Sequence, residues 1–397
     1  MTDHLPEPDA EARAHSARLT ALLREEMAAS GPMPFARFME RCLYAPGLGY
    51  YSAGSLKFGE AGDFVTAPEL GELFARCVVA HVLPTLETLG DAADVLELGG
   101  GSGAFAEAAL TALAEVSRVP HRYGILEPSA DLRERQRERL AAALPDELAA
   151  RVQWLDRPPA EPWRGVLFAN EVIDALPTTR FALREGEVFE EHVDVDATGR
   201  FVVVDRPADA LVAGAVRHLE RTLGRALDEG YRSEILPQLP YWLQAVAGSL
   251  EAGLMLFIDY GYPRSDYYRV DRRDGTLRAF YRQRMHDDPF FWPGLQDLTA
   301  SVDFTALAEA GEHAGFELAA YVPQAHFLMT GGLEQAFSTA HAVARTEKQR
   351  YQLAQQVKQL TLPERMGERF QAMLFTRGLD GGVVCPALGG FDRRSRL

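Results

Sequence analysis

A carboxylate and a run of spaced glycines stand together in the segment Glu97-Leu-Gly-Gly-Gly-Ser-Gly103. Gly99, Gly101 and Gly103 carry no side chain where the chain must turn sharply, so a ligand can lie directly against the backbone. Glu97 precedes the first of these glycines by two positions, where its carboxylate can face an ammonium group. We therefore expect a small-molecule site at this turn.

The same segment fits two kinds of cofactor site. The spacing Gly99-x-Gly101-x-x-Ala104 matches the dinucleotide fingerprint with alanine in its third place. In a dinucleotide site, however, the strand normally stays apolar up to its first glycine, whereas this strand carries Glu97. An acid ahead of spaced glycines is typical of sites for S-adenosyl-L-methionine (SAM), where no phosphate has to be held. The sequence thus favours SAM over a nicotinamide cofactor, and a glycine-rich turn without a ligand is the third alternative.

A second carboxylate, Glu127, follows the apolar run 123–126, which predicts the neighbouring strand. At a strand end about 25 residues beyond the glycine turn, it is placed to accept hydrogen bonds from both hydroxyls of a ribose. The alternative is that Glu127 only caps the helix that begins near Ser129. Asp156, after the next predicted strand, is a candidate contact for an adenine amino group.

Polar residues also follow the predicted strand 165–169. In an open α/β sheet, a reacting group belongs at the carboxyl end of a central strand beside the glycine turn. Asn170 and Glu171 are therefore the first catalytic candidates. Asp174 lies one helical turn beyond Glu171, so the two carboxylates could share a face, although Asp174 could instead be a helix cap or a solvated residue.

The elements that must hold these residues alternate between short apolar runs and helical patterns, which predicts a largely parallel α/β sheet. The predicted strands are 95–98, 123–126, 152–155, 165–169, 254–258, 315–322 and 370–375. Helical spacing at 11–30 and 34–44 predicts an N-terminal cover. Glycine, proline and aromatic residues at 44–51 and 58–70 indicate ordered loops, in which Asp63 or Thr66 either caps the helix predicted at 68–89 or contacts the ligand.

Between the fourth and fifth strands the pattern changes to alternating segments at 180–205, followed by helical stretches near 208–229 and 239–251. We expect 178–252 to be an insertion above the strand ends that serves as a substrate lid. The expected division is 1–66 for the N-terminal helices and loop, 67–177 for the first part of the core, the insertion, and 253–397 for the second part with further helices. Aromatic residues at 280–292 predict an irregular functional loop.

Composition limits the partners and the compartment. The formal net charge of −16 over 397 residues argues against general binding to nucleic acid. Three widely separated cysteines give no disulfide framework or metal site and fit a reducing cytoplasm. The first ten residues lack the pattern of a targeting signal, and no apolar stretch approaches the length of a membrane span. The oligomeric state stays open, with a dimer as one alternative.

Several separate segments, taken together from about residue 32 to 378, resemble the MidA family of SAM-dependent methyltransferases. The matching segments are Leu43-Tyr-x-Pro-Gly-x-Gly-Tyr-Tyr51, Gly62-Asp-Phe-x-Thr-x-Pro-Glu69, Glu97-x-Gly-x-Gly-x-Gly103, Glu127-Pro-Ser with Gln136, Asn170-Glu-x-x-Asp-Ala-Leu-Pro177, Ile258-Asp-Tyr-Gly261, Gly275-Thr-Leu-Arg278, Asp297-Leu-Thr-Ala-x-Val-Asp-Phe304 and Met366-Gly-Glu-x-Phe370. This chain departs from the family at Gln283 and Ser301, where relatives are expected to carry histidine.

The resemblance implies a class I methyltransferase sheet of seven strands with the last one antiparallel. It implies that Asp63, Thr66, the glycine turn and Glu127 hold SAM, and we count Pro128 and Ser129 with them. Mitochondrial members of the family are protein arginine methyltransferases needed for assembly of respiratory complex I. A protein substrate, such as a subunit of that complex, is therefore the expected partner.

Methyl transfer requires that nucleophile, methyl group and sulfur be aligned in a water-poor site. A carboxylate can bind a guanidinium group through two hydrogen bonds and accept its proton. We expect Glu171 in this role, Asp174 and Glu69 as helpers, and Asn170 as an orienting amide. Two alternatives stay open: a SAM-binding assembly protein without turnover, and a nicotinamide-dependent oxidoreductase.

Overall fold

Seven strands form the main path of the central sheet in the order β15-β16-β10-β5-β2-β3-β4, and β14 pairs with β10 beside this path. The computed structural model of the protein describes residues 5–53, 66–379, 388 and 391–397. The strands are β2 (Asp94–Leu98), β3 (Tyr123–Leu126), β4 (Val152–Leu155), β5 (Trp163–Asn170), β10 (Leu250–Tyr262), β14 (Val302–Asp303), β15 (Glu317–Pro323) and β16 (Phe370–Arg377).

The direction of the strands in this sheet confirms the expected fold class. Strand β16 runs antiparallel to both of its neighbours, β10 and β15. The other pairs along the main path, from β10 through β5, β2 and β3 to β4, are parallel. All carboxyl ends of these parallel strands therefore meet at one edge, which is where ligands bind in open α/β sheets.

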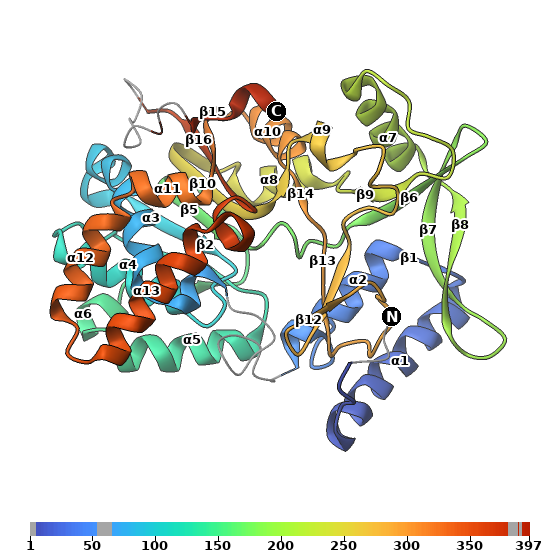
Figure 1. Cartoon of the computed structure of the whole chain (residues 1–397), viewed down its shortest axis with the longest axis horizontal. Coiled ribbons are helices and arrows are strands. Elements are labelled where there is room, and N and C mark those ends of the chain that lie inside the picture. Colours follow the sequence, from blue (N-terminus) through green and yellow to red (C-terminus); the bar gives the residue numbers. More distant parts are fainter. Residues whose placement is uncertain (1–4, 54–65, 380–387, 389–390) are drawn as a thin grey trace.

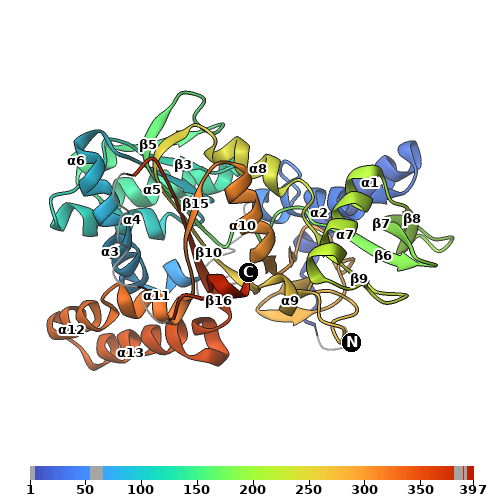
Figure 2. The ribbon, with the colours of Figure 1, turned by 90° about the horizontal axis from the view of Figure 1, so that it is seen from above.

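Helices cover both faces of the sheet (Figures 1 and 2). On one face, apolar side chains such as Val95 and Leu256 pack against the helices α3, α4 and α11. On the other face, Leu96 and Met255 pack against α8 and α10. The helices outside the N-terminal region and the insertion are α3 (Glu72–Leu89), α4 (Ala104–Glu115), α5 (Ala130–Ala143), α6 (Asp146–Ala149), α8 (Leu239–Ala247), α9 (Arg264–Tyr267), α10 (Phe304–His313), α11 (Gln324–Thr330), α12 (Leu333–Val343) and α13 (Glu347–Thr361).

Helix α3 differs from the expectation in two ways. The helix predicted at 68–89 is divided at Gly71, whose φ of +140° separates the short turn η2 (Ala67–Leu70) from α3. The segment Glu72–Ala92 is also long and apolar enough to span a membrane, so the expectation that no stretch approaches that length is wrong. Its side chains Phe74, Val78 and Leu86 are buried against the central sheet, which is the behaviour of a core helix.

The N-terminal helices and the insertion form one lobe beside the central sheet, visible on the right in Figures 1 and 2. Their sheet has the order β1-β7-β6-β9, with β8 paired to β7, and β1 comes from the N-terminal region. Helix α8, which the sequence places in the insertion, packs on the central sheet instead. The expected insertion 178–252 therefore includes a helix that covers the central sheet, and we call residues 178–235, which carry β6 to β9 and α7, the inserted unit. The elements of the lobe are α1 (Ala10–Ser30), β1 (Met33–Pro34), α2 (Phe35–Tyr44), β6 (Thr179–Arg184), β7 (Glu187–Val195), β8 (Phe201–Pro207), α7 (Ala210–Leu223) and β9 (Arg232–Ile235).

Part of the stretch expected to be irregular is a small sheet with the order β12-β11-β13. Its strands are β11 (Arg278–Tyr281), β12 (Arg284–His286) and β13 (Asp297–Thr299). Arg282 and Gln283 connect β11 to β12 with φ values of 47° and 61°, the conformation of a two-residue hairpin turn. Neither residue is glycine or asparagine, so the sequence lacks the usual signal for such a turn. The remaining short turns are η1 (Tyr50–Ser52), η3 (Gly90–Ala92), η4 (Pro363–Gly367) and η6 (Arg394–Arg396).

Candidate functional site

A cavity of about 1090 Å³ lies at the carboxyl ends of β2, β3, β5 and β10. The structure brings most of the predicted site residues together around it. Its lining includes the predicted residues Thr66, Glu69, Glu97, Gly99, Gly101, Glu127, Pro128, Asp156, Asn170, Glu171 and Asp174. Gly103 and Ser129 are not part of this lining, and Asp63 lies outside the described residues.

The glycine turn leaves its backbone open to the cavity because the chain adopts left-handed conformations there. Gly99, Gly101 and Gly103 have φ values of +66°, +53° and +83°, which favour glycine. Gln136 of α5 holds the turn from behind, since its side-chain nitrogen donates to the Gly101 carbonyl at 2.9 Å. A Cβ on Gly100 would lie 2.8 Å from a methyl group of Ile125, so the turn also packs closely against β3.

Glu97 is almost completely buried, with 3% of its surface exposed, and one carboxylate oxygen accepts a 2.8 Å hydrogen bond from the Tyr123 hydroxyl. Burial raises the pKa of Glu97 to about 7, although the hydrogen bond from Tyr123 lowers it. A buried carboxylate at the edge of a cavity gains most from a cationic partner. This is the environment expected for a group that faces an ammonium.

Glu127 does not cap α5. The cap is Ser129, whose hydroxyl accepts a hydrogen bond from the Leu132 N–H at 3.3 Å and donates to the Tyr51 carbonyl at 2.7 Å. The Ser129 N–H in turn donates to one Glu127 oxygen at 2.9 Å, and Gln136 donates to the other at 3.4 Å. Burial raises the pKa of Glu127 to about 7, against these lowering hydrogen bonds. The long contact to Gln136 leaves the second oxygen able to accept further hydrogen bonds.

Other predicted contacts have different surroundings. The Asp156 side chain is 91% exposed and pairs with Arg133 at 2.5 Å, so a hydrogen bond from a ligand would compete with a guanidinium. Thr66 precedes η2, but its side chain makes no capping hydrogen bond. Glu69 in η2 accepts a hydrogen bond from Ser102 of the glycine turn, which ties the two segments together at the cavity.

Asn170, Glu171 and Asp174 gather where β5 ends. Glu171 has a φ of +52°, a strained conformation for a residue other than glycine, and strain of this kind is common at functional sites. Asn170 Nδ2 donates to a Glu171 oxygen at 3.0 Å. Burial, with Asp174 nearby, raises the pKa of Glu171 to about 8, and burial raises the pKa of Asp174 to about 6. The described residues offer no donor to two buried oxygens here, Asn170 Oδ1 and Asp174 Oδ1.

Asp259 and Tyr260 at the end of β10 are among the site residues that were not predicted. One Asp259 oxygen accepts hydrogen bonds from the backbone N–H groups of Ile173 and Asp174, at 3.0 and 3.2 Å, so Asp259 fixes the turn that carries Asp174. Tyr260 lines the cavity, and its side chain lowers the pKa of Asp174. Both follow the predicted strand 254–258, so their position at a strand end was an available signal.

The N-terminal region also reaches the cavity, through Tyr44 and Tyr51. Their rings are stacked with centroids 5.5 Å apart. The Tyr44 hydroxyl donates to the Ala175 carbonyl at 2.9 Å, and the Tyr51 hydroxyl donates to Asp297 at 3.0 Å. The tyrosines therefore join α2 and η1 to the loop after β5 and to β13. Both tyrosines belong to the predicted ordered loop 44–51, and no role in the site was predicted for them.

The cavity residues fit SAM. A glycine turn with an open backbone, the buried Glu97 and the buried Glu127 offer a surface for an adenosine, acceptors for its ribose hydroxyls and a carboxylate for its amino group. Carboxylates exceed cations in the lining, where the acids Glu40, Glu69, Glu97, Glu127, Asp156, Glu171, Asp174 and Asp297 face the arginines Arg133, Arg272, Arg278 and Arg369. Such a site suits positively charged ligands.

Comparison with known proteins supports this assignment. Residues 77–322 match the model of a family of S-adenosyl-L-methionine-dependent methyltransferases. A crystal structure of a protein from Burkholderia thailandensis bound to S-adenosyl-homocysteine is 42% identical to this chain and superposes with a TM-score of 0.90. The match covers 99% of this chain and 100% of that chain. S-adenosyl-homocysteine is SAM without its transferable methyl group, so the expected cofactor is confirmed.

Curated relatives match along most of their length. "Protein arginine methyltransferase NDUFAF7, mitochondrial" from Danio rerio is 28% identical, over 88% of this chain and 84% of the relative. The Homo sapiens protein of the same name is 26% identical, over 92% of this chain and 86% of the relative. These relatives are named as mitochondrial proteins. That finding contradicts the cytoplasmic location expected from the first ten residues and the cysteine content.

Proposed function

We propose that this chain, which belongs to the MidA-like family of SAM-dependent methyltransferases, transfers a methyl group to arginine side chains of a protein. The relatives named protein arginine methyltransferase support this acceptor. The observation that carries the proposal is the pair of buried oxygens, Asn170 Oδ1 and Asp174 Oδ1, which accept no hydrogen bond from the described residues. A guanidinium presents five N–H donors in a plane and could satisfy both oxygens.

SAM, when bound, supplies a methyl group attached to a positively charged sulfur. The residues of this chain must then hold the acceptor nitrogen in line and take up the proton that it loses as the new N–C bond forms. Glu171 is our candidate for the proton acceptor, because a pKa of about 8 makes its ionised form a stronger base than an ordinary carboxylate, and that form is populated as the pH approaches 8. Asp174 and Asn170 orient the guanidinium, and Glu69 is the more distant helper.

We further propose that the acceptor protein is a subunit of respiratory complex I, as the resemblance to the MidA family implies. The experiment is a pull-down with the full chain, followed by mass spectrometry of methylated arginines in cells with and without the protein. Arginine sites whose methylation depends on the protein are the expected result. Binding of S-adenosyl-homocysteine with no protein-dependent arginine methylation would instead favour a SAM-binding assembly protein.

The Glu171→Gln variant tests the catalytic assignment. Loss of the proton acceptor should lower the rate of tritiated methyl transfer by about 10²- to 10⁴-fold, the usual contribution of a general base. Calorimetry should show unchanged affinity for S-adenosyl-homocysteine, because Glu171 is not among the proposed SAM contacts. Glu115→Gln, which removes a half-exposed carboxylate paired with Arg76 away from the cavity, is the matched control. Full turnover by Glu171→Gln would remove this residue from the mechanism.

A further inference from the structure

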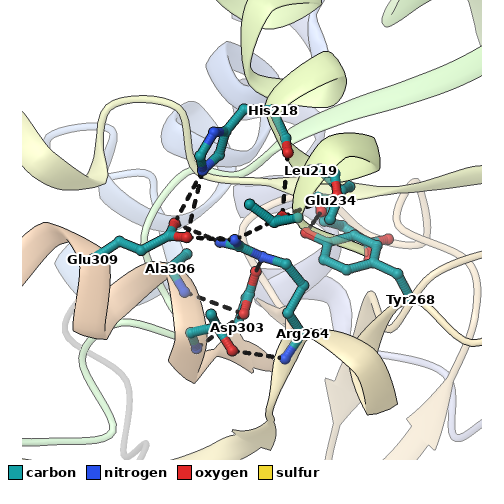
Figure 3. Close-up of polar contacts among 10 residues, drawn as sticks. His218, Leu219, Glu234, Arg264, Tyr268, Asp303, Ala306 and Glu309 are labelled. Carbon is teal, nitrogen blue, oxygen red and sulfur yellow. Dashed lines mark hydrogen bonds and ion pairs between the residues drawn. The ribbon is translucent and has the colours of Figure 1, made fainter. Parts of the chain in front are cut away.

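The inserted unit is fixed to the methyltransferase core by a cluster around the buried Arg264, shown in Figure 3. The Arg264 guanidinium donates to both carboxylate oxygens of Glu309 in α10, at 2.6 and 2.7 Å, and to Asp303 at 3.1 Å. It also donates to the Thr222 hydroxyl of α7 at 3.0 Å, and His218 of the same helix lies 3.4 Å from Glu309. Helix α7 of the insertion is thereby held against α10.

A buried residue of the insertion, Glu234 in β9, reaches the cavity wall. It is 1% exposed, and its backbone carbonyl accepts a hydrogen bond from Tyr268 at 2.9 Å (Figure 3). Its carboxylate accepts hydrogen bonds from the backbone N–H groups of Thr276 at 2.8 Å and Leu277 at 3.3 Å. We call residues 275–278 the acceptor wall, because Gly275, Thr276 and Arg278 line the cavity beside the end of β10.

The approach between Glu234 and the acceptor wall is close enough to depend on a glycine. A Cβ on Gly275 would lie 2.2 Å from a Glu234 carboxylate oxygen, and the φ of Gly275 is +77°. No other residue type fits this position without displacing the carboxylate. The Glu234 carboxylate of the insertion therefore packs directly against Gly275 of the core, and this contact leaves no room for a side chain at position 275.

The acceptor wall is joined in turn to Asp174. The Thr276 hydroxyl accepts a hydrogen bond from the Ser301 N–H at 3.0 Å. The adjacent Ala300 N–H donates to the Asp174 carbonyl, also at 3.0 Å. A continuous set of hydrogen bonds thus leads from Glu234 through Thr276 and residues 300–301 to Asp174, whose Oδ1 is buried and accepts no hydrogen bond from the described residues.

We propose that Glu234 is a positioning residue through which the inserted unit fixes the acceptor wall and Asp174, and so sets how an acceptor arginine is held. This inference rests on the proposed arginine methylation. Glu234 does not line the cavity, so it acts through the wall and not by touching the acceptor. The Glu234 carboxylate accepts hydrogen bonds from Tyr267, Thr276 and Leu277, none of which is proposed to hold SAM, so we expect cofactor binding to be independent of it.

The test compares Glu234→Gln with the control Glu191→Gln. Glu191, 2% exposed on the neighbouring β7, pairs with Arg180 and Arg232. Arg180 also lies 3.7 Å from the Glu234 carboxylate, so the two variants share the loss of a charge beside this arginine, and only Glu234→Gln changes the hydrogen bonds to Thr276 and Leu277. In Glu234→Gln, an amide donor replaces an acceptor oxygen, so the Thr276 and Leu277 amides should exchange hydrogen about tenfold faster. The acceptor in the assay is protein prepared from cells that lack this chain, and its apparent KM should rise about tenfold. Both kcat and the affinity for S-adenosyl-homocysteine should stay near the wild-type values.

Gly275→Ala is the second variant, because its Cβ pushes the same carboxylate away from the opposite side, and it should reproduce the faster exchange and the higher KM. Unchanged exchange at the acceptor wall in both variants would overturn the proposal, and so would faster exchange with an unchanged KM. If the wild-type chain methylates no arginine of the acceptor pool, the proposed function fails. The exchange measurement then still decides whether Glu234 positions the wall.

Discussion

Replacing Glu127 with glutamine should weaken the binding of S-adenosyl-homocysteine. The Ser129 N–H requires an acceptor, so the amide oxygen of the new side chain would stay there and its NH2 group would face Gln136 and the cavity. A ribose hydroxyl would then lose a charged acceptor. A hydrogen bond to a charged group contributes about 1.5–3 kcal/mol. The expected loss of affinity is therefore roughly 10- to 150-fold.

The affinity for S-adenosyl-homocysteine should also depend on pH, and Glu127→Gln should change that dependence. The pKa values of Glu97 and Glu127 are both raised to about 7, and the ligand favours the ionised carboxylates. The ionised fraction of each acid rises with pH, so affinity should increase between pH 6 and pH 8 by up to about tenfold for each acid. The affinity of the wild-type protein should therefore change by up to about 100-fold over this pH range. The affinity of Glu127→Gln should change only about tenfold, which is the part due to Glu97.

Isothermal titration calorimetry with S-adenosyl-homocysteine at pH 6, 7 and 8 measures both effects. Thermal melting of the free variant checks that the fold is intact, and Glu115→Gln controls for loss of a carboxylate elsewhere. The assignment of Glu127 to the ribose would be refuted by an affinity within twofold of the wild type. A pH dependence as steep as that of the wild type would refute the claim that Glu127 titrates near pH 7.

Three further outcomes are expected. The initial rate of methyl transfer at saturating SAM should rise as pH increases towards about 8, because Glu171 must lose its proton to act as a base, and Glu171→Gln should abolish this rise. Gly165→Ala should lower the free energy of unfolding by at least about 3 kcal/mol, since its Cβ would lie 1.8 Å from the Asp94 carbonyl. The control Gly214→Ala in α7 has open space around its Cβ and should raise the free energy of unfolding by about 0.5–1 kcal/mol. Urea unfolding of both variants measures the two changes. Arg264→Ala should lower the free energy of unfolding by roughly 2–4 kcal/mol, because the partly buried acids Asp303 and Glu309 lose their cation, and an unfolding midpoint equal to that of the wild type would contradict this.

The cofactor side of the site could be predicted because its residues are close in sequence. Glu97 and the glycines belong to one strand and turn, and Glu127 ends the next strand, so periodicity and strand order placed them together. The acceptor side could not be assembled in this way. Thr276 hydrogen-bonds to Glu234 of the insertion and Asp297 to Tyr51 of the N-terminal region, and no local pattern predicts these contacts. Asp259 ends a predicted strand, but its hydrogen bonds to the turn at Ile173 and Asp174 become evident only in the structure.

The parts of the fold that differed from expectation lack local signals. The hairpin turn at Arg282 and Gln283 has left-handed backbone conformations without glycine or asparagine. Strand β1 contains two residues, too few to show alternation, yet it pairs Met33 with Val193 of the insertion. Helix α8 has an apolar face that could cover either of the two sheets. Only the packing of side chains such as Leu243 shows that it covers the central sheet.

The position of β16 has a consequence for the biosynthesis of the protein. Among the described residues this strand is the last one made, at Phe370–Arg377, yet it lies between β10 and β15. Until it emerges from the ribosome, β15 has no place in the sheet and β10 presents an unpaired edge to other chains. We expect the nascent chain to remain prone to aggregation until β16 has been made, and products truncated before residue 370 to be removed by proteases.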